Sequence, residues 1–99
     1  MKRLEGRSAL ITGAARGIGL AFAEAYVAEG AVVAIGDIDV ARAEEAARRL
    51  GPAAWALRLD VTDPASIDAA VAAVVERTGG IDILINNAAV FDLAPIVEI

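Results

Sequence analysis

The fold of this chain is decided by residues 8–19, which read SALITGAARGIG. The apolar run at residues 8–12 ends at a glycine, a pattern typical of a buried strand. Of the three glycines that follow, Gly13 makes a tight turn, Gly17 lets backbone N–H groups approach a pyrophosphate, and Gly19 allows close packing of a helix on the sheet. The stretch therefore predicts a strand, a phosphate-binding turn and a helix. The plainer alternative is a tight strand–helix connection with no ligand.

The segment behind this turn has the spacing of a helix. Ile18, Phe22, Ala25 and Tyr26 recur every three or four residues, and Gly30 follows as a C-cap. We therefore expect an amphipathic helix whose apolar face carries these four residues.

The rest of the chain repeats the alternation of apolar strands and helices. We expect strands at residues 31–36, 54–59 and 81–85, and helices at residues 41–50 and 64–78. The order βαβαβαβ, with nearly continuous apolar strands, predicts an α/β fold with a doubly wound parallel sheet, right-handed crossovers and strand order 3-2-1-4. This is the Rossmann fold.

The sequence of the third expected helix indicates where it begins and which of its faces is apolar. Asp63 is expected to be its N-cap, with Pro64 at the first helical position. One apolar face is expected to carry the four branched residues Ile67, Val71, Val74 and Val75.

Composition excludes several classes of function. The chain has 99 residues, a net charge of −5, and neither cysteine nor histidine. These absences exclude a Cys/His zinc site, a Ser-His-Asp triad and a Cys-His pair, and we expect no metal. Scattered basic residues in an acidic chain argue against nucleic acid and anionic membranes as partners. We see no secretory signal and expect a cytoplasmic protein.

Asp37 adds an element that is independent of the glycines. It stands at the end of the second expected strand, 18 residues after Gly19, close to the spacing of about 20 for a carboxylate that binds the adenosine ribose. The alternative is a solvated residue that caps the next helix, a role that Asp39 fills better. Asp37 would repel a 2′-phosphate whereas Arg16 would attract one, and the nearer carboxylate favours NAD over NADP.

Polar residues also follow the third and fourth strands. Asp60 is placed to bond the adenine amino group while Val61 packs on the ring, although Asp60 is equally well explained as an ordinary strand-end aspartate. The amides of Asn86 and Asn87 can tie adjacent strand ends together, line the ribose, or simply form a turn.

These motifs resemble the short-chain dehydrogenase/reductase family, and the resemblance covers the whole chain. Residues 12–19 resemble the family's cofactor loop, Asp37 its NAD-selecting acid, residues 60–61 its adenine pair, and residues 86–89 its Asn-Asn-Ala-Gly motif, with Ala89 in place of the final glycine. The stretches at residues 21–27 and 86–99 look most like bacterial NAD-dependent sorbitol (polyol) dehydrogenases of that family.

The resemblance implies a site for the adenosine and pyrophosphate of NAD. Its expected residues are Gly13, Ala15, Arg16, Gly17, Ile18, Gly19, Asp37, Ile38, Asp60, Val61, Asn87 and Ala88.

The catalytic residues implied by the family have no counterpart in this sequence. Its chemistry needs a tyrosine followed four positions later by a lysine, but the sequence has one tyrosine, Tyr26, and one lysine, Lys2. We therefore expect residues 1–99 to be the N-terminal dinucleotide-binding part of a single domain, truncated before its catalytic half and inactive alone.

The resemblance implies that the full-length protein transfers hydride between NAD and a secondary alcohol, such as sorbitol, and forms a homo-oligomer. Two alternatives stay open. One is a non-catalytic nucleotide-binding or redox-sensing module, and the other is a structural fragment that binds nothing.

Overall fold

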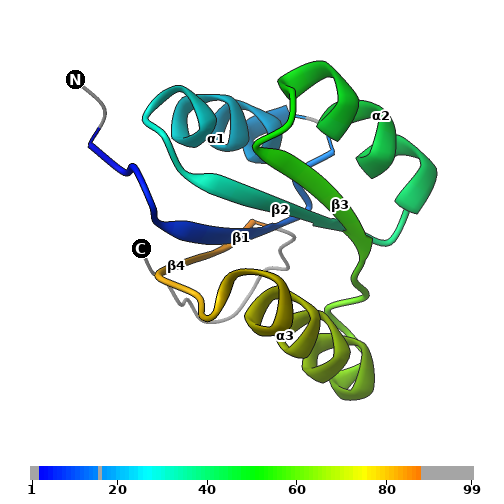
Figure 1. The fold of residues 1–99 in the computed structure, drawn as a ribbon. Coiled ribbons are helices and arrows are strands. Elements are labelled where there is room, and N and C mark those ends of the chain that lie inside the picture. Colours follow the sequence, from blue (N-terminus) through cyan, green and yellow to red (C-terminus); the bar gives the residue numbers. More distant parts are fainter. Residues whose placement is uncertain (1–2, 16, 88–99) are drawn as a thin grey trace.

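Strands and helices alternate along the chain from Ser8 to Asn86 (Figure 1). The computed structural model describes residues 3–15 and 17–87. The elements are β1 (Ser8–Thr12), α1 (Gly17–Ala28), β2 (Val32–Asp37), α2 (Val40–Leu50), β3 (Ala54–Arg58), α3 (Pro64–Thr78) and β4 (Ile83–Asn86). Their order is the one predicted from the apolar runs. β1 and α3 have the predicted bounds, and the bounds of β2, α2, β3 and β4 differ from the prediction by at most two residues.

The strands of the described residues form one four-stranded sheet in the order β3-β2-β1-β4. All three pairings are parallel, with Thr12 of β1 opposite both Gly36 of β2 and Asn86 of β4. The predicted doubly wound parallel sheet is therefore confirmed.

Helices cover both faces of the sheet. In Figure 1, α1 and α2 lie on one side and α3 lies on the other. Successive side chains of β1 pack against the helices on opposite faces of the sheet, because side chains alternate across a strand. Ile11 joins the buried cluster on the side of α1 and α2, whereas Leu10 joins Val74 of α3 in a smaller cluster.

Two helices begin at aspartates, as predicted. Asp39 is the N-cap of α2, where its carboxylate accepts a hydrogen bond from the backbone N–H of Arg42 at 3.2 Å. Asp63 is the N-cap of α3, where its carboxylate accepts from the N–H of Ala65 at 3.0 Å, and Pro64 follows it. Each carboxylate satisfies an N–H group that has no carbonyl partner inside its helix.

The apolar face predicted for α1 is wrong. Its buried residues are Gly19 and Ala23, whereas Ile18 is 69% exposed and Phe22 is 39% exposed. Ala25 is also exposed, so of the predicted set only Tyr26 packs against the core. Since α1 is apolar on nearly all sides, the spacing of its large residues did not identify the buried side. Gly19 and Ala23 make the closest contact with the sheet, and Leu20, Tyr26 and Val27 pack beside them as partly buried residues.

The face predicted for α3 is correct only in part. Val74 is fully buried, and Ala70 lies beside it in the core. Ile67, Val71 and Val75 are between 36% and 43% exposed. Ala70 and Val74 therefore face the sheet, while Ile67, Val71 and Val75 lie at the edges of this face.

Side chains tie the amino ends of β1 and β4 together. The carboxylate of Asp82 accepts a hydrogen bond from the N–H of Ser8 at 2.8 Å, and the N–H of Asp82 donates to the carbonyl of Ser8, also at 2.8 Å. The Ser8 hydroxyl bonds the hydroxyl of Thr78 at 2.9 Å, which joins the end of α3 to the same edge. Ser8 is thus a structural residue of the sheet.

Within residues 3–15 and 17–87, no helix has the length and apolar character needed to span a bilayer.

The corrected face of α1 can be tested with one substitution at two positions. We expect Ala23→Leu to lower the free energy of unfolding by about 1–3 kcal/mol, because the larger side chain does not fit between helix and sheet. Ala25→Leu, on the exposed side of the same helix, should change it by less than about 0.5 kcal/mol. Urea unfolding followed by circular dichroism measures both. Equal losses in the two variants would contradict the assigned face.

Candidate functional site

The carboxyl ends of the parallel strands bring the predicted site residues to one edge of the sheet. The last residues of β1, β2, β3 and β4 are Thr12, Asp37, Arg58 and Asn86. Backbone hydrogen bonds link neighbouring ends: Gly13 N–H donates to the carbonyl of Gly36 at 2.7 Å, and Leu59 N–H donates to the carbonyl of Asp37 at 3.0 Å. The glycine turn, Asp37 and the segment that leads to Asp60 therefore form one connected region.

The glycine turn requires glycine for two different reasons. Gly13 and Gly17 have φ angles of 62° and 63°, in the left-handed region that favours glycine. Gly19 lies in α1, where a Cβ would collide with the carbonyl oxygen of Gly13 and lie 2.9 Å from the Cα of Ala14. The space beside Gly17 differs, because a Cβ there would meet no described atom within 4 Å. The turn is thus packed tightly at Gly19 and open at Gly17.

The start of α1 lies directly behind the glycine turn. Its first turn contains no acidic residue, and the same holds for the first turns of α2 and α3, whose N-caps are Asp39 and Asp63. The N–H groups of a first helical turn carry a partial positive charge that favours an anion. The exposed start of α1, at Gly17 and Ile18, can therefore receive an external anion.

Asp37 lies between the glycine turn and α2. Its Oδ2 accepts a long hydrogen bond from Ala15 N–H at 3.3 Å, and its Oδ1 accepts from Asp39 N–H at 3.0 Å. A carboxylate offers about four acceptor positions, so these bonds orient the group and leave acceptors for a hydroxyl-bearing ligand. Ile38, the next residue, is 59% exposed.

Asp60 is held by a threonine two residues ahead. Its Oδ1 accepts from the Thr62 hydroxyl at 2.7 Å and from the Thr62 N–H at 3.0 Å, and the Asp60 N–H donates to the Ser66 hydroxyl at 2.9 Å. The hydrogen bonds from Thr62, with a smaller contribution from the charge of Arg58, lower the pKa of the Asp60 carboxyl below its ordinary value. The group stays ionised in mildly acidic solution and remains an acceptor.

Val61 lines a small apolar cavity of about 140 Å³ below the strand ends. Leu59 of the same connection and Ile67 of α3 line it with Val61. The side chain of Val61 thus contributes to an apolar surface next to Asp60.

Asn87 and Thr12 fasten the end of β4 to the end of β1. The Asn87 Nδ2 donates to the carbonyl of Gly13 at 3.2 Å, and its backbone N–H donates to the Thr12 hydroxyl at 2.9 Å. That hydroxyl donates to the Oδ1 of Asn86 at 3.0 Å. Of the alternatives for the asparagine pair, the structure supports the joining of strand ends. Through Gly13, Asn87 also fixes the glycine turn.

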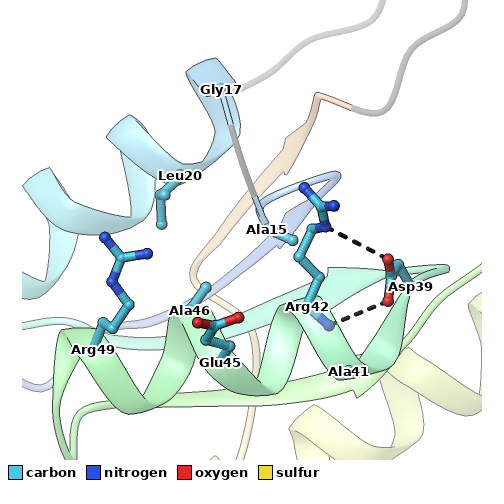
Figure 2. Close-up of a pocket in the computed structure, with 9 residues that line it drawn as sticks. All are labelled: Ala15, Gly17, Leu20, Asp39, Ala41, Arg42, Glu45, Ala46 and Arg49. Carbon is cyan, nitrogen blue, oxygen red and sulfur yellow. Dashed lines mark hydrogen bonds and ion pairs between the residues drawn. The ribbon is translucent and has the colours of Figure 1, made fainter.

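A groove of about 550 Å³ runs between the start of α1 and α2 (Figure 2). Ala15 and Gly17 line its side at the glycine turn, and Asp39, Arg42 and Arg49 line it from the start and exposed side of α2. This groove therefore opens beside the turn and carries charged side chains.

Two predicted site residues, Arg16 and Ala88, lie outside the residues that the structure describes. Sequence reasoning missed Gly36, where an added Cβ would lie 2.9 Å from Leu59 Cδ2, so that Leu59 would have to shift. Its signal was a glycine inside an apolar strand, which indicates a close approach. Sequence reasoning also missed Thr12 as the hydroxyl between the strand ends, and no spacing pattern marks that role.

A family model described as short chain dehydrogenase matches residues 7–99. The chain belongs to the short-chain dehydrogenase family. The resemblance predicted from the glycine turn, Asp37 and the asparagine pair is confirmed.

Several relatives in the short-chain dehydrogenase family act on polyols by name. The chain is 67% identical over 97 residues to sorbitol dehydrogenase of Cereibacter sphaeroides, covering 98% of this chain and 38% of that protein. It is 67% identical over 94 residues to galactitol 2-dehydrogenase of Agrobacterium fabrum, covering 95% of this chain and 37% of that protein. It is 48% identical over 100 residues to D-threitol dehydrogenase of Mycolicibacterium smegmatis, covering 98% and 38%. The chain spans little more than a third of these relatives.

A solved short-chain dehydrogenase structure has the same fold. It is 3-ketoacyl-(acyl-carrier-protein) reductase from Brucella melitensis complexed with NADH, with a TM-score of 0.80 and 45% identity. The match covers 83% of this chain and 34% of the reductase. The NADH in that complex agrees with the cofactor expected from Asp37.

The tight packing at Gly19 gives a stability prediction. We expect Gly19→Ala to lower the free energy of unfolding by about 1–3 kcal/mol, because the methyl group collides with Gly13 and Asn87 and the turn must shift. Gly80→Ala is the control, since a Cβ there meets nothing within 4 Å. Urea unfolding measures both variants, and equal stability of the two would contradict the close contact.

Proposed function

We propose that this chain binds the adenosine and pyrophosphate portions of NAD and that the full-length protein is an NAD-dependent oxidoreductase acting on a polyol. The observation that carries the proposal is the exposed first turn of α1 behind the glycine turn, which contains no acidic residue, with the Asp37 carboxylate bonded to the same turn at Ala15. An anion and a neighbouring sugar are the ligand groups that this pair of features suits.

The residues present fit the phosphate portion of such a ligand. Open space beside Gly17 leaves room for a group to approach the backbone, and the first turn of α1 offers N–H donors without a carboxylate of its own. In the proposal, residues 13–19 hold the pyrophosphate, with Arg16 as an adjacent cation. Asn87 keeps the turn in position through its bond to the Gly13 carbonyl.

The adenosine end is assigned to the next two strand ends. Asp37 and Ile38 receive the ribose, and the free acceptors of Asp37 bind its hydroxyls. Asp60 accepts from the adenine amino group, and Val61 packs against the ring. Asn87 and Ala88 complete the set of residues that we assign to the cofactor.

The bound cofactor supplies the hydride acceptor for oxidation of a secondary alcohol. The chain's own residues contribute binding and orientation to that reaction. None is assigned a catalytic role, since Tyr26 lies in α1 and packs against the core and the sequence has no lysine besides Lys2.

The names of the relatives support a polyol as the substrate. Two relatives at 67% identity are dehydrogenases of sorbitol and galactitol. Sorbitol oxidised to fructose is therefore the proposed reaction. The cytoplasmic location and the homo-oligomer expected for the whole protein stay predictions.

The ribose assignment can be tested by calorimetric titration of the chain with NAD and NADP. We expect the parent to prefer NAD, because Asp37 repels a 2′-phosphate. Asp37→Asn should weaken NAD binding about tenfold, since an amide offers fewer acceptors to the ribose hydroxyls, and should move the preference toward NADP.

The control for this titration is Asp68→Asn, which removes a charge from an exposed position of α3. It should leave both affinities unchanged. Equal discrimination of the two cofactors by parent and Asp37→Asn would remove Asp37 from the proposed site.

The substrate is tested with the full-length protein. NADH formation should be fastest with sorbitol or galactitol among a panel of polyols and simple secondary alcohols, and the 99-residue chain alone should give none. Turnover of simple alcohols with no polyol activity would refute the polyol proposal but leave the cofactor proposal standing.

A further inference from the structure

A line of polar contacts runs from the glycine turn to the first turn of α2. The Asp37 carboxylate accepts from Ala15 N–H at 3.3 Å and from Asp39 N–H at 3.0 Å. The Asp39 carboxylate in turn accepts from the backbone N–H of Arg42 at 3.2 Å. The proposed ribose acid and an arginine of α2 are thus connected through a single residue, Asp39.

The side chain of Arg42 also pairs with Asp39. Its Nε lies 3.5 Å from Asp39 Oδ2, with the two side chains 51% and 49% exposed. This distance is longer than the 2.7–2.9 Å or so of a strong charge-assisted hydrogen bond, so the pair is loose. A guanidinium has five N–H donors, so Arg42 could bind another anion once the charge of Asp39 is removed.

Arg42 is better placed for a ligand at the turn than the other arginine of the groove. Figure 2 shows Arg42 extending from α2 on the side of Ala15, with dashed lines to Asp39, whereas Arg49 extends toward Leu20. Arg49 lies seven residues further along α2, which is about 10 Å along a helix axis. A second hollow, away from the turn, is lined by Arg49, Glu24 and Leu50.

We infer that Asp39 and Arg42 form a second determinant of cofactor selectivity beside Asp37. Asp39 holds and neutralises the guanidinium at the mouth of the groove, so that Arg42 does not attract a phosphate on the 2′-oxygen of the adenosine ribose. The inference rests on the proposed function and adds to it a pair that sets the preference between the two cofactors.

The pair is tested by titrating the chain with adenosine 5′-monophosphate and adenosine 2′,5′-bisphosphate, followed by amide chemical shifts in NMR. Asp39→Asn removes the charge but keeps a good helix cap. We expect it to raise the affinity for the bisphosphate about tenfold relative to the monophosphate, because one charge-assisted contact to Arg42 is released. In an Arg42→Ala background, the same Asp39→Asn change should leave the ratio of the bisphosphate and monophosphate affinities unchanged.

Glu45→Gln is the matched control, since Glu45 lines the same groove and the change in net charge is identical. Glu45→Gln should alter the ratio of the bisphosphate and monophosphate affinities by less than about threefold. An equal rise in Asp39→Asn and Glu45→Gln, or a rise that persists without Arg42, would overturn the inference.

The titration also separates this inference from the proposed function. If the parent binds the monophosphate but Asp39→Asn does not change the ratio of the two nucleotide affinities, the selectivity pair is refuted and the proposed site stands. If the folded parent binds neither nucleotide, both the proposed site and the selectivity pair are refuted.

Discussion

The close approach of α1 to the end of β1 is the constraint on which the rest of the site depends. Gly19 lies against the Gly13 carbonyl with no room for a methyl group, and Asn87 closes the contact from β4. Because of this contact, the first turn of α1 lies next to the edge where the described strands end. Among the other described residues of the candidate site, Asp37 ends the neighbouring strand β2, and Asn87 follows the neighbouring strand β4.

The fold could be predicted from the sequence because its signals are local. The apolar runs, the glycine turn and the two aspartate caps each depend on a few consecutive residues, and the structure has each where it was expected. The buried face of α1 could not be predicted, because the helix is apolar nearly all round. Its buried side is selected by the available space, which favours Gly19 and Ala23 over Ile18 and Phe22.

In the candidate site, too, some features could be predicted from the sequence and others could not. Asp37 and Asp60 could be found from their positions at strand ends, because parallel strands put those ends on one edge. The bonds that orient them could not be found. Thr62 holds Asp60 through two hydrogen bonds, and Asp39 both caps α2 and contacts Asp37. Such contacts depend on rotamers and loop geometry that no residue spacing specifies.

Gly36 has a consequence for the size of the ligand that the edge can accept. Leu59 packs where a side chain at Gly36 would be, and the bond from Leu59 to the Asp37 carbonyl fixes how far the third strand end lies from the second. The sheet pairing thus fixes the distance between the backbone at Asp37 and the segment that leads to Asp60. In the proposed site, that distance limits the span between sugar and base of a nucleotide that contacts both acids.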